Sequence, residues 1–269
     1  MTDATTYSSK LAGTRILIVG GSSGIGFAVA NAVLELGASG IIIASSTASK
    51  IDGAIARLRE AYPNKSQHAE LLGLPVNLKD QDKLEANIEG LLDFATANKT
   101  KLLDHIIYTA GDPLVAGNKL DETTLKAVQE AGMVRFFGPL ILGTRAPAYM
   151  NPGPKSSITL TTGSVSQKPI AGWTIPASYG TALHGLTRNL ALDLKPLRVN
   201  LVSPGAVSTE LWDGMEKGQR DAFLDHIKAT LPTGSVPGPD VVAEAFLLSL
   251  RDVNCTGTII NSNGGGLLI

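Results

Sequence analysis

The sequence predicts an α/β fold: a doubly wound parallel sheet of about seven strands with helices on both faces. Short apolar runs alternate with longer helical segments, which is typical of buried parallel strands that helices cover on both sides. A glycine-rich turn links the first apolar run to the first helical segment. No repeat, low-complexity tract or linker interrupts the chain, so we expect one domain over residues 1–269.

The glycine-rich turn, residues 20–26, follows the apolar run 16–19 and precedes a predicted helix at 27–36. A helix N-terminus offers unpaired N–H groups and a positive dipole end to an anion. Gly20 permits a tight turn, Gly24 lets the backbone approach a pyrophosphate, and Gly26 allows close helix packing. The turn therefore predicts a dinucleotide-phosphate site, and a purely structural turn is the alternative. The residues assigned to the phosphates are Gly20, Ser22, Ser23, Gly24, Ile25 and Gly26.

The remaining elements follow in alternation. Apolar runs predict further strands at residues 41–44, 71–76, 105–108, 158–160, 199–202 and 257–260. Helical segments are predicted at residues 51–62, 83–94, 125–150 and 177–194. We expect the long segment to bend or break at Gly138-Pro139, because proline cannot continue the helical hydrogen-bond pattern. Residues from about 208 to 236, which include Trp212, Met215 and Phe223, are predicted to form a mobile substrate lid.

Composition excludes several classes of partner. The net charge of −1, from 23 basic and 24 acidic residues, argues against a nucleic-acid or anionic-membrane partner. Cys255 is the only cysteine, so neither a disulfide framework nor a metal site is expected. The first ten residues lack the apolar core of a signal peptide, and no apolar run reaches the roughly 18 residues of a membrane span. We therefore expect a soluble, cytoplasmic protein that acts on a small molecule.

Several later motifs occur in one recognisable order. Thr109-Ala110-Gly111 and Thr162-Gly163-Ser164 each follow a predicted strand, and Ser203-Pro204-Gly205 follows Arg198-Val199-Asn200. Together with the glycine turn, they make the chain resemble a short-chain dehydrogenase/reductase over about residues 10–266. The resemblance implies a Rossmann-like fold with a nicotinamide cofactor across the carboxyl ends of the strands.

The resemblance also assigns positions along the cofactor. It places the adenine near Asn77 and Leu78, the ribose at Ala110 and Gly111, and the nicotinamide at Pro204, Gly205, Val207 and Thr209. The helical segments 125–150 and 177–194 are more apolar than one core requires, so we expect a homo-oligomer, a dimer or a tetramer.

The end of the second predicted strand indicates which nicotinamide cofactor binds. An NAD site usually has an acidic residue there, which accepts a hydrogen bond from the ribose 2′-hydroxyl. This chain has Ser45, Ser46 and Thr47, with Lys50 further on and no carboxylate before Asp52. Hydroxyls, a helix start and a lysine suit a 2′-phosphate, so the sequence predicts NADP(H). The same serines and threonine also suit helix capping, and the two roles are compatible.

The catalytic residues depart from the family pattern. The family normally uses an Asn, a Ser and a Tyr-x-x-x-Lys pair, whose lysine lowers the tyrosine pKa so that the phenol can protonate an alkoxide. Residues 185–187, Gly-Leu-Thr, indicate a register that puts the tyrosine position on Pro176 and the lysine position on Gly180. Tyr179 lies roughly 60° around the helix from Pro176, and Leu183 stands four residues after it.

The rest of the predicted catalytic set is Arg135, Ser164, Trp173 and Asp112. Arg135 occupies the Asn position, and of the usual residues only Ser164 remains. Arg135 either contacts a polar ligand or forms an ion pair with a carboxylate such as Asp112. Trp173 either stacks on a substrate cation or aromatic ring, or fills the core. Asp112 is either an anionic partner for a cationic substrate or a turn residue.

This pattern is similar to an atypical branch of the family found in fungal indole-alkaloid pathways of secondary metabolism. Those enzymes reduce an iminium with NADPH, and some guide a cycloaddition or ring closure. This chain has Ile170 where the branch implies an aspartate, which weakens the cycloaddition role. The sequence therefore predicts an NADP(H)-dependent reductase of an imine, an iminium or a carbonyl. The alternatives are a silent cofactor-binding scaffold or sensor, and a cyclase that uses the cofactor as a pocket wall.

Overall fold

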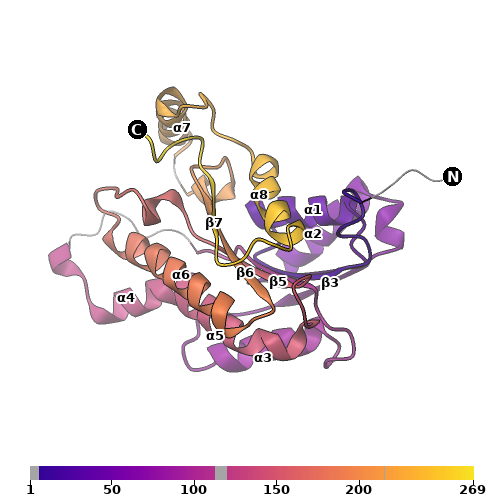
Figure 1. Cartoon of the computed structure of the whole chain (residues 1–269). Coiled ribbons are helices and arrows are strands. Elements are labelled where there is room, and N and C mark those ends of the chain that lie inside the picture. Colours follow the sequence, from indigo (N-terminus) through magenta and orange to yellow (C-terminus); the bar gives the residue numbers. More distant parts are fainter. Residues whose placement is uncertain (1–5, 113–119, 215) are drawn as a thin grey trace.

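The computed structural model describes residues 6–112, 120–214 and 216–269 (Figure 1). Within these ranges one parallel sheet of seven strands has the order β3-β2-β1-β4-β5-β6-β7. The strands are β1 (Arg15–Val19), β2 (Gly40–Ser45), β3 (Glu70–Pro75), β4 (His105–Tyr108), β5 (Ser157–Thr161), β6 (Arg198–Pro204) and β7 (Ile259–Ser262). The predicted α/β class and its parallel sheet are confirmed.

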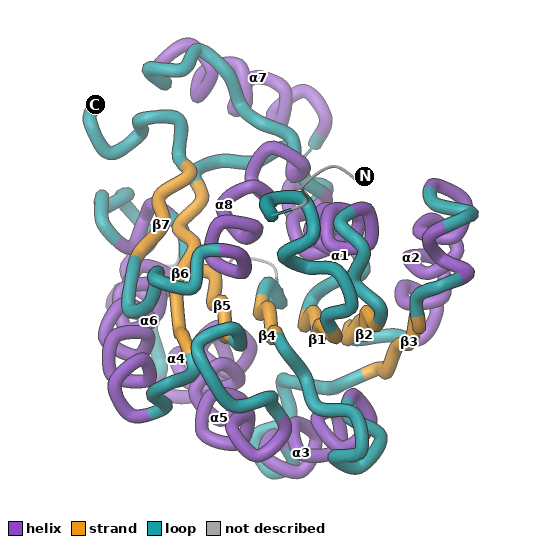
Figure 2. The backbone as a smooth tube through the Cα atoms, turned by 45° about the vertical axis from the view of Figure 1, so that its right-hand side comes forward, coloured by secondary structure: helices purple, strands orange, loops and turns teal. Residues whose placement is uncertain are grey.

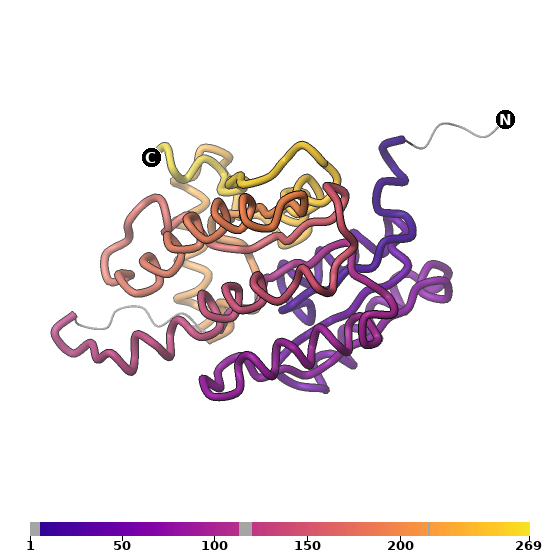
Figure 3. Tube along the Cα trace, turned by 60° about the horizontal axis from the view of Figure 1, so that its bottom comes forward, coloured from indigo at the N-terminus to yellow at the C-terminus, as the bar shows by residue number. Residues whose placement is uncertain are grey.

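Helices cover both faces of this sheet, as Figure 2 shows. One face carries α1 (Gly24–Glu35), α2 (Ala48–Ala61) and α8 (Pro239–Arg251). The other face carries α3 (Leu84–Ala95), α5 (Gly138–Arg145) and α6 (Thr174–Asp193), and α4 (Leu125–Gly132) packs against α6. Figure 3 shows α3 (purple), α4 and α5 (magenta) and α6 (orange) lying side by side. The helix α7 (Lys217–Thr230) stands apart, beyond the carboxyl ends of the strands.

The two faces explain the unbroken apolar runs of the sequence. Successive residues of a strand point to opposite faces. In β1, Leu17 therefore packs into the core under α3 and α5, while Ile16 and Ile18 pack into the core under α1 and α8. All five residues of β1 are buried, because neither face of a central parallel strand meets water.

The long helical segment does not break at Gly138-Pro139: the backbone stays helical there, and the hydrogen-bond pattern changes to a π turn just before it. α4 ends at Gly132, a π-helical turn spans Met133–Phe137, and α5 starts at Gly138 with Pro139 in its first turn. The sequence did not indicate the π turn. It carries Arg135, and the buried hydroxyl of Tyr108 donates a hydrogen bond of 2.6 Å to the Val134 carbonyl within it. A single π turn inserted between α-helices often marks a functional position.

The strand order reverses direction between β1 and β4. From β1 the chain builds outward through β2 to β3, and it then returns to place β4 on the other side of β1. The loops after β1 and β4 leave the sheet in opposite directions, which opens a crevice at their carboxyl ends. Within the described residues, no helix combines the length and the apolar character that crossing a membrane requires.

Candidate active site

A cavity of about 940 Å³ lies at the carboxyl ends of the strands. Every predicted cofactor-binding residue except Thr47 lines it, and so do the four predicted catalytic residues. Thr47 lies outside because it is the N-cap residue of α2, where its side chain is exposed and makes no capping hydrogen bond. The structure therefore brings together residues that lie as far apart in the sequence as Gly20 and Thr209.

The glycine turn is packed against the loop after β4. Gly20 has a φ of +92°, and a Cβ atom there would lie 2.5 Å from the Ala110 backbone nitrogen. A Cβ on Gly26 would lie 2.3 Å from the Gly20 carbonyl oxygen and 2.4 Å from Thr109 Oγ1. Side chains at these two positions would push β1, α1 and the Thr109 loop apart. The glycines thus let the backbone of the turn form the wall of the cavity.

The end of β2 is lined by hydroxyl groups and a cation. The Oγ atoms of Ser22 and Ser45 lie 2.8 Å apart, and Ser46 and Lys50 line the cavity beside them. Among the described lining residues the carboxylates are Asp112 and Glu210, and neither belongs to β2 or α2. This donor set fits a phosphate ester and offers no carboxylate acceptor for a free ribose hydroxyl.

Sequence reasoning missed Arg57, which supports this end of the cavity. Its Nη2 donates a hydrogen bond of 2.7 Å to the Ser22 carbonyl, and its guanidinium lies 3.8 Å from the Phe27 ring centroid. The spacing of Lys50 and Arg57, seven residues apart and therefore on one face of α2, was the signal that could have found it.

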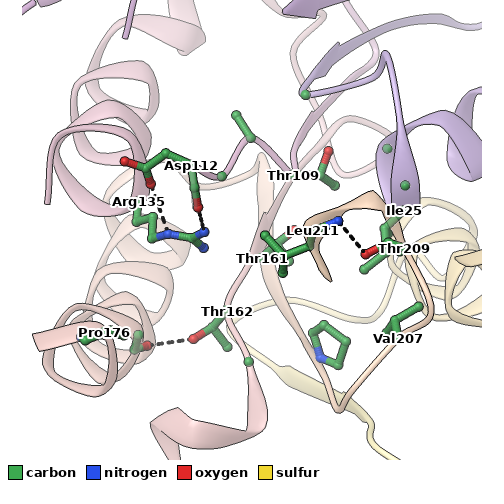
Figure 4. Close-up of a pocket in the computed structure, with 18 of the residues that line it drawn as sticks. Ile25, Thr109, Asp112, Arg135, Thr161, Thr162, Pro176, Val207, Thr209 and Leu211 are labelled. Atoms are coloured by element: carbon green, nitrogen blue, oxygen red, sulfur yellow. Dashed lines mark hydrogen bonds and ion pairs between the residues drawn. The ribbon is translucent and has the colours of Figure 1, made fainter. Parts of the chain in front are cut away.

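Arg135 and Asp112 form the charged centre of the other half of the cavity (Figure 4). Arg135 Nε lies 3.2 Å from Asp112 Oδ1, and Nη2 donates to the Asp112 backbone carbonyl. Lys79 Nζ lies 3.8 Å from the second carboxylate oxygen. Burial lowers the pKa of Arg135 from its ordinary value, and Asp112 opposes that shift. Two cations therefore surround one carboxylate, so the three side chains carry a net positive charge.

These contacts bear on the readings of Arg135 and Asp112 that the sequence left open. The predicted ion pair between Arg135 and Asp112 is present. Asp112 is accordingly already paired on both oxygens and is not a free carboxylate. The guanidinium lies directly over Gly111, where a Cβ would be 2.9 Å from Nη2.

The face of α6 toward the cavity has neither a phenol nor an ammonium group. Pro176 and Gly180, the predicted tyrosine and lysine positions, both line the cavity. Thr162 Oγ1 donates a hydrogen bond of 2.9 Å to the Gly180 carbonyl (Figure 4). Tyr179 points elsewhere: its hydroxyl donates to the Val128 carbonyl at 2.9 Å, and its ring packs on Phe136.

We expect Tyr179→Phe to leave the rate of hydride transfer within a few-fold of the parent. The lost hydrogen bond should lower the free energy of unfolding by about 1 kcal/mol, because the half-buried Val128 carbonyl loses its donor. Single-turnover kinetics and thermal unfolding of the same variant would check both values. A rate loss of about 10²-fold or more, the size expected for a removed general acid, would contradict this placement.

The substrate end of the cavity is mainly apolar. Trp173 is half-buried at the start of α6 and lines the cavity, and it belongs to neither hydrophobic core of the described residues. The predicted lid contributes further apolar lining residues to the same cavity: Leu211, Trp212, Phe223, Ile227 and Leu231. Ser164 lies at the first position of a 3-10 helix (Ser164–Ser166) and lines the cavity. The reading of Trp173 as a core residue is therefore not supported.

Comparison with known proteins gives consistent matches over the whole chain. A family model described as an SDR-like Rossmann domain matches residues 7–269. The chain is 42% identical to the short-chain dehydrogenase/reductase fsr5 of Gibberella fujikuroi, over 97% of each chain. It is 38% identical to the short-chain dehydrogenase/reductase malC of Malbranchea aurantiaca, over 96% of each chain.

Solved structures agree with these sequence matches. The MalC reductase/Diels-Alderase of Malbranchea aurantiaca superposes with a TM-score of 0.91 over 97% of this chain and 99% of that chain. A small-chain dehydrogenase solved in complex with NADPH is 26% identical, with a TM-score of 0.72 over 95% of this chain and 99% of that chain.

Proposed function

The chain belongs to the short-chain dehydrogenase/reductase family of oxidoreductases, and from this we propose that it is an NADP(H)-dependent reductase of an imine or iminium. The observation that carries the proposal is the composition of the α6 face, where Pro176 and Gly180 stand in place of the proton-donating pair. The substrate end around Trp173 and the lid suits a bulky, mostly apolar molecule.

The residues of the cavity fit an NADP(H) molecule. The glycine turn exposes backbone at the N-terminus of α1, where a pyrophosphate accepts hydrogen bonds. Ser22, Ser45 and Lys50 offer donors to a 2′-phosphate, and the end of β2 lacks the carboxylate that would repel it. The cofactor would supply a hydride when bound, with Pro204, Gly205 and Thr209 along its nicotinamide end. The relative solved with NADPH supports this assignment.

We expect NADPH to bind more tightly than NADH, and Ser45→Asp to shift the preference toward NADH. An aspartate there would accept from a free ribose hydroxyl and repel a 2′-phosphate. Isothermal titration of both cofactors would measure the ratio of dissociation constants. Thr47→Asp is the matched control, since it adds the same charge outside the cavity and should change the ratio less. Equal affinities of the parent for the two cofactors would count against the assignment.

The missing proton donor favours an iminium over a ketone. Hydride addition to a ketone leaves an alkoxide that needs a proton, whereas an iminium becomes a neutral amine without one. Tyr108 is a phenol that lines the cavity, but its hydroxyl donates to the Val134 carbonyl and burial raises its pKa. A phenol with a raised pKa is a weak acid. Among the described lining residues of β4, the π turn and α6, none is therefore suited to protonate an alkoxide. Lys168 lines the cavity from the loop before α6, where its ammonium donates a hydrogen bond of 3.3 Å to the Gly266 carbonyl.

Arg135 and Trp173 would position the substrate. Arg135 uses Nε and Nη2 on Asp112, and its remaining N–H groups can hold a substrate carbonyl. The Trp173 ring can lie against the cationic carbon–nitrogen bond, since an aromatic face attracts a cation. Asp112 acts through Arg135 in this arrangement, because its carboxylate is already paired.

Ring closure is the less supported part of the activity. The MalC protein is described as a Diels-Alderase as well as a reductase. At the place where an aspartate is implied, this chain has Ile170, which is 50% exposed and cannot accept a proton. We therefore assign reduction to this chain and treat ring closure as an outcome to be measured.

A single-turnover assay with NADPH tests the proposal. A cyclic N-alkyl iminium and the matching cyclic ketone are mixed with excess protein, and the loss of NADPH absorbance is followed together with product analysis by mass spectrometry. We expect consumption of NADPH with the iminium and little with the ketone. Equal reduction of the ketone would show that the site has a proton donor. Binding of NADPH without reduction of any iminium tested would favour the silent scaffold.

We propose further that residues 208–236 act as the substrate lid and that the chain forms a homo-oligomer. Trp212 and Phe223 stack with ring centroids 5.2 Å apart, which ties the loop to α7. Leu125 on α4 and Leu192 on α6 are 74% and 70% exposed, and a second copy of the chain would cover such side chains. Position 215 of the predicted lid lies outside the described residues.

A further inference from the structure

Glu210 connects the predicted lid to the glycine turn. Its Oε2 accepts a hydrogen bond of 3.0 Å from the backbone N–H of Gly24, the first residue of α1. The neighbouring Thr209 also contacts the turn, since its Cγ2 would lie 3.4 Å from a Cβ on Gly24. Gly24 has a φ of +51°, a backbone conformation that favours glycine.

The Gly24 N–H group belongs to the set that a dinucleotide pyrophosphate needs. The first four N–H groups of a helix lack partners within the helix, and they attract an anion together with the positive end of the dipole. The Glu210 carboxylate now accepts from one of them. A carboxylate and a pyrophosphate in contact distance repel each other and compete for the same donors. Cofactor binding therefore requires Glu210 to leave Gly24.

Movement of Glu210 would be passed to the residues that face the substrate. Glu210 is the first residue of a 3-10 helix, Glu210–Trp212. The indole nitrogen of Trp212 donates to the Val207 carbonyl at 2.7 Å, and its ring stacks on Phe223 of α7. Leu211 and Trp212 line the substrate end of the cavity. A change at the glycine turn is thus coupled to the lid through one short, hydrogen-bonded segment.

We propose that Glu210 is a positioning residue that holds the lid on the glycine turn until the cofactor displaces it. The negative charge of the cofactor would release Glu210, and the freed segment would then adopt the position that admits substrate. This makes cofactor binding precede substrate binding. The inference rests on the proposed function, because it takes NADP(H) as the molecule that displaces Glu210.

Cofactor affinity of charge variants tests the proposal. Glu210→Gln removes the charge that competes with the pyrophosphate. Glu210→Ala removes this charge and also the hydrogen bond to the Gly24 N–H. We expect both to bind NADPH about tenfold more tightly than the parent in isothermal titration. Glu216→Gln is the matched control, since it removes the same charge from an exposed residue at the start of α7. Its affinity should equal that of the parent. Glu210 is exposed, so each variant should keep the parent thermal midpoint.

Hydrogen exchange gives a second readout that does not depend on activity. Without cofactor, the backbone amides of residues 210–214 should exchange faster in Glu210→Ala than in the parent, because the hydrogen bond from Gly24 of α1 is lost. Adding NADPH to the parent, without substrate, should raise its exchange rate there toward that of the variant. No such rise would overturn the release step.

The outcomes separate the proposed role of Glu210 from the cofactor assignment. If the parent binds NADPH and neither Glu210 variant binds it more tightly, the proposed role of Glu210 is overturned while the cofactor assignment stands. If Glu216→Gln tightens binding as much as Glu210→Gln, the change in affinity comes from the net charge of the protein. The proposed role of Glu210 is then also overturned. If the parent does not bind NADPH at all, both proposals fall.

Discussion

Replacing Arg135 with alanine is expected to lower single-turnover reduction of the true substrate by about 10²-fold, the size expected when a lost contact misplaces the substrate relative to the hydride. The dissociation constant of NADPH should change little, because Arg135 contacts Asp112 and the substrate half of the cavity. The reason is geometric: only a planar guanidinium can hold Asp112 with Nε and Nη2 and still present N–H groups to a substrate.

Two further substitutions make this test specific. Arg135→Lys should not restore turnover, because an ammonium lacks the planar fork. Arg145→Ala is the matched control on neighbouring α5, where Arg145 forms ion pairs of 3.0 Å and 2.9 Å with Glu85 and Glu89 on the surface. It should leave turnover unchanged and cost at most about 1 kcal/mol of unfolding free energy.

A silent scaffold would behave differently in the same experiment. It would have no turnover to lose, and Arg135→Ala would show only a lower thermal midpoint as Asp112 lost its main partner. If Arg135→Ala reduced iminium substrates as fast as the parent, Arg135 would have no part in the reaction.

Substituting Gly26 with alanine should give the largest loss of stability and of cofactor binding. The new Cβ would lie 2.3 Å from the Gly20 carbonyl oxygen and 2.4 Å from Thr109 Oγ1, and the first of these is backbone that cannot rotate away. We expect about 3 kcal/mol less unfolding free energy, as for severe overpacking. The thermal midpoint should fall by roughly 6–12 °C. Because the shifted turn forms the phosphate wall, NADPH affinity should fall roughly tenfold or more.

Gly53→Ala is the control for the same chemical change in a helix. Gly53 is exposed in α2, and a Cβ added there would have nothing within 4 Å. Alanine there should raise the unfolding free energy by roughly 0.5–1 kcal/mol, since glycine is a poor helix former. Equal thermal midpoints for Gly26→Ala and the parent would mean that the turn can open without cost, contrary to its close packing.

Pro176 and Gly180 line the cavity where the family pattern has a tyrosine and a lysine. Thr162 of the neighbouring loop donates a hydrogen bond to the Gly180 carbonyl. The cofactor half of the cavity has the glycine turn and hydroxyl groups, while α6 presents neither a phenol nor an ammonium group to the substrate half. This division is consistent with a reductase whose substrate arrives already charged.

The sheet, the glycine turn and the register of α6 could all be predicted from the sequence alone. Each of these depends on local patterns: apolar runs such as 16–19, the glycine spacing at 20–26, and the run 185–187 that put Pro176 rather than Tyr179 on the cavity. Local patterns suffice because a strand or a helix repeats its geometry over a few residues.

Which polar groups meet is settled by the packing of the folded chain and not by any local pattern. Glu210 reaches Gly24 across 186 residues of chain, and Lys79 lies near the second carboxylate oxygen of Asp112. The fold also leaves Thr47 outside the cavity and places Arg135 on a π turn. Such pairings depend on how whole elements pack and on where long side chains end, and neither is encoded in the spacing of a motif.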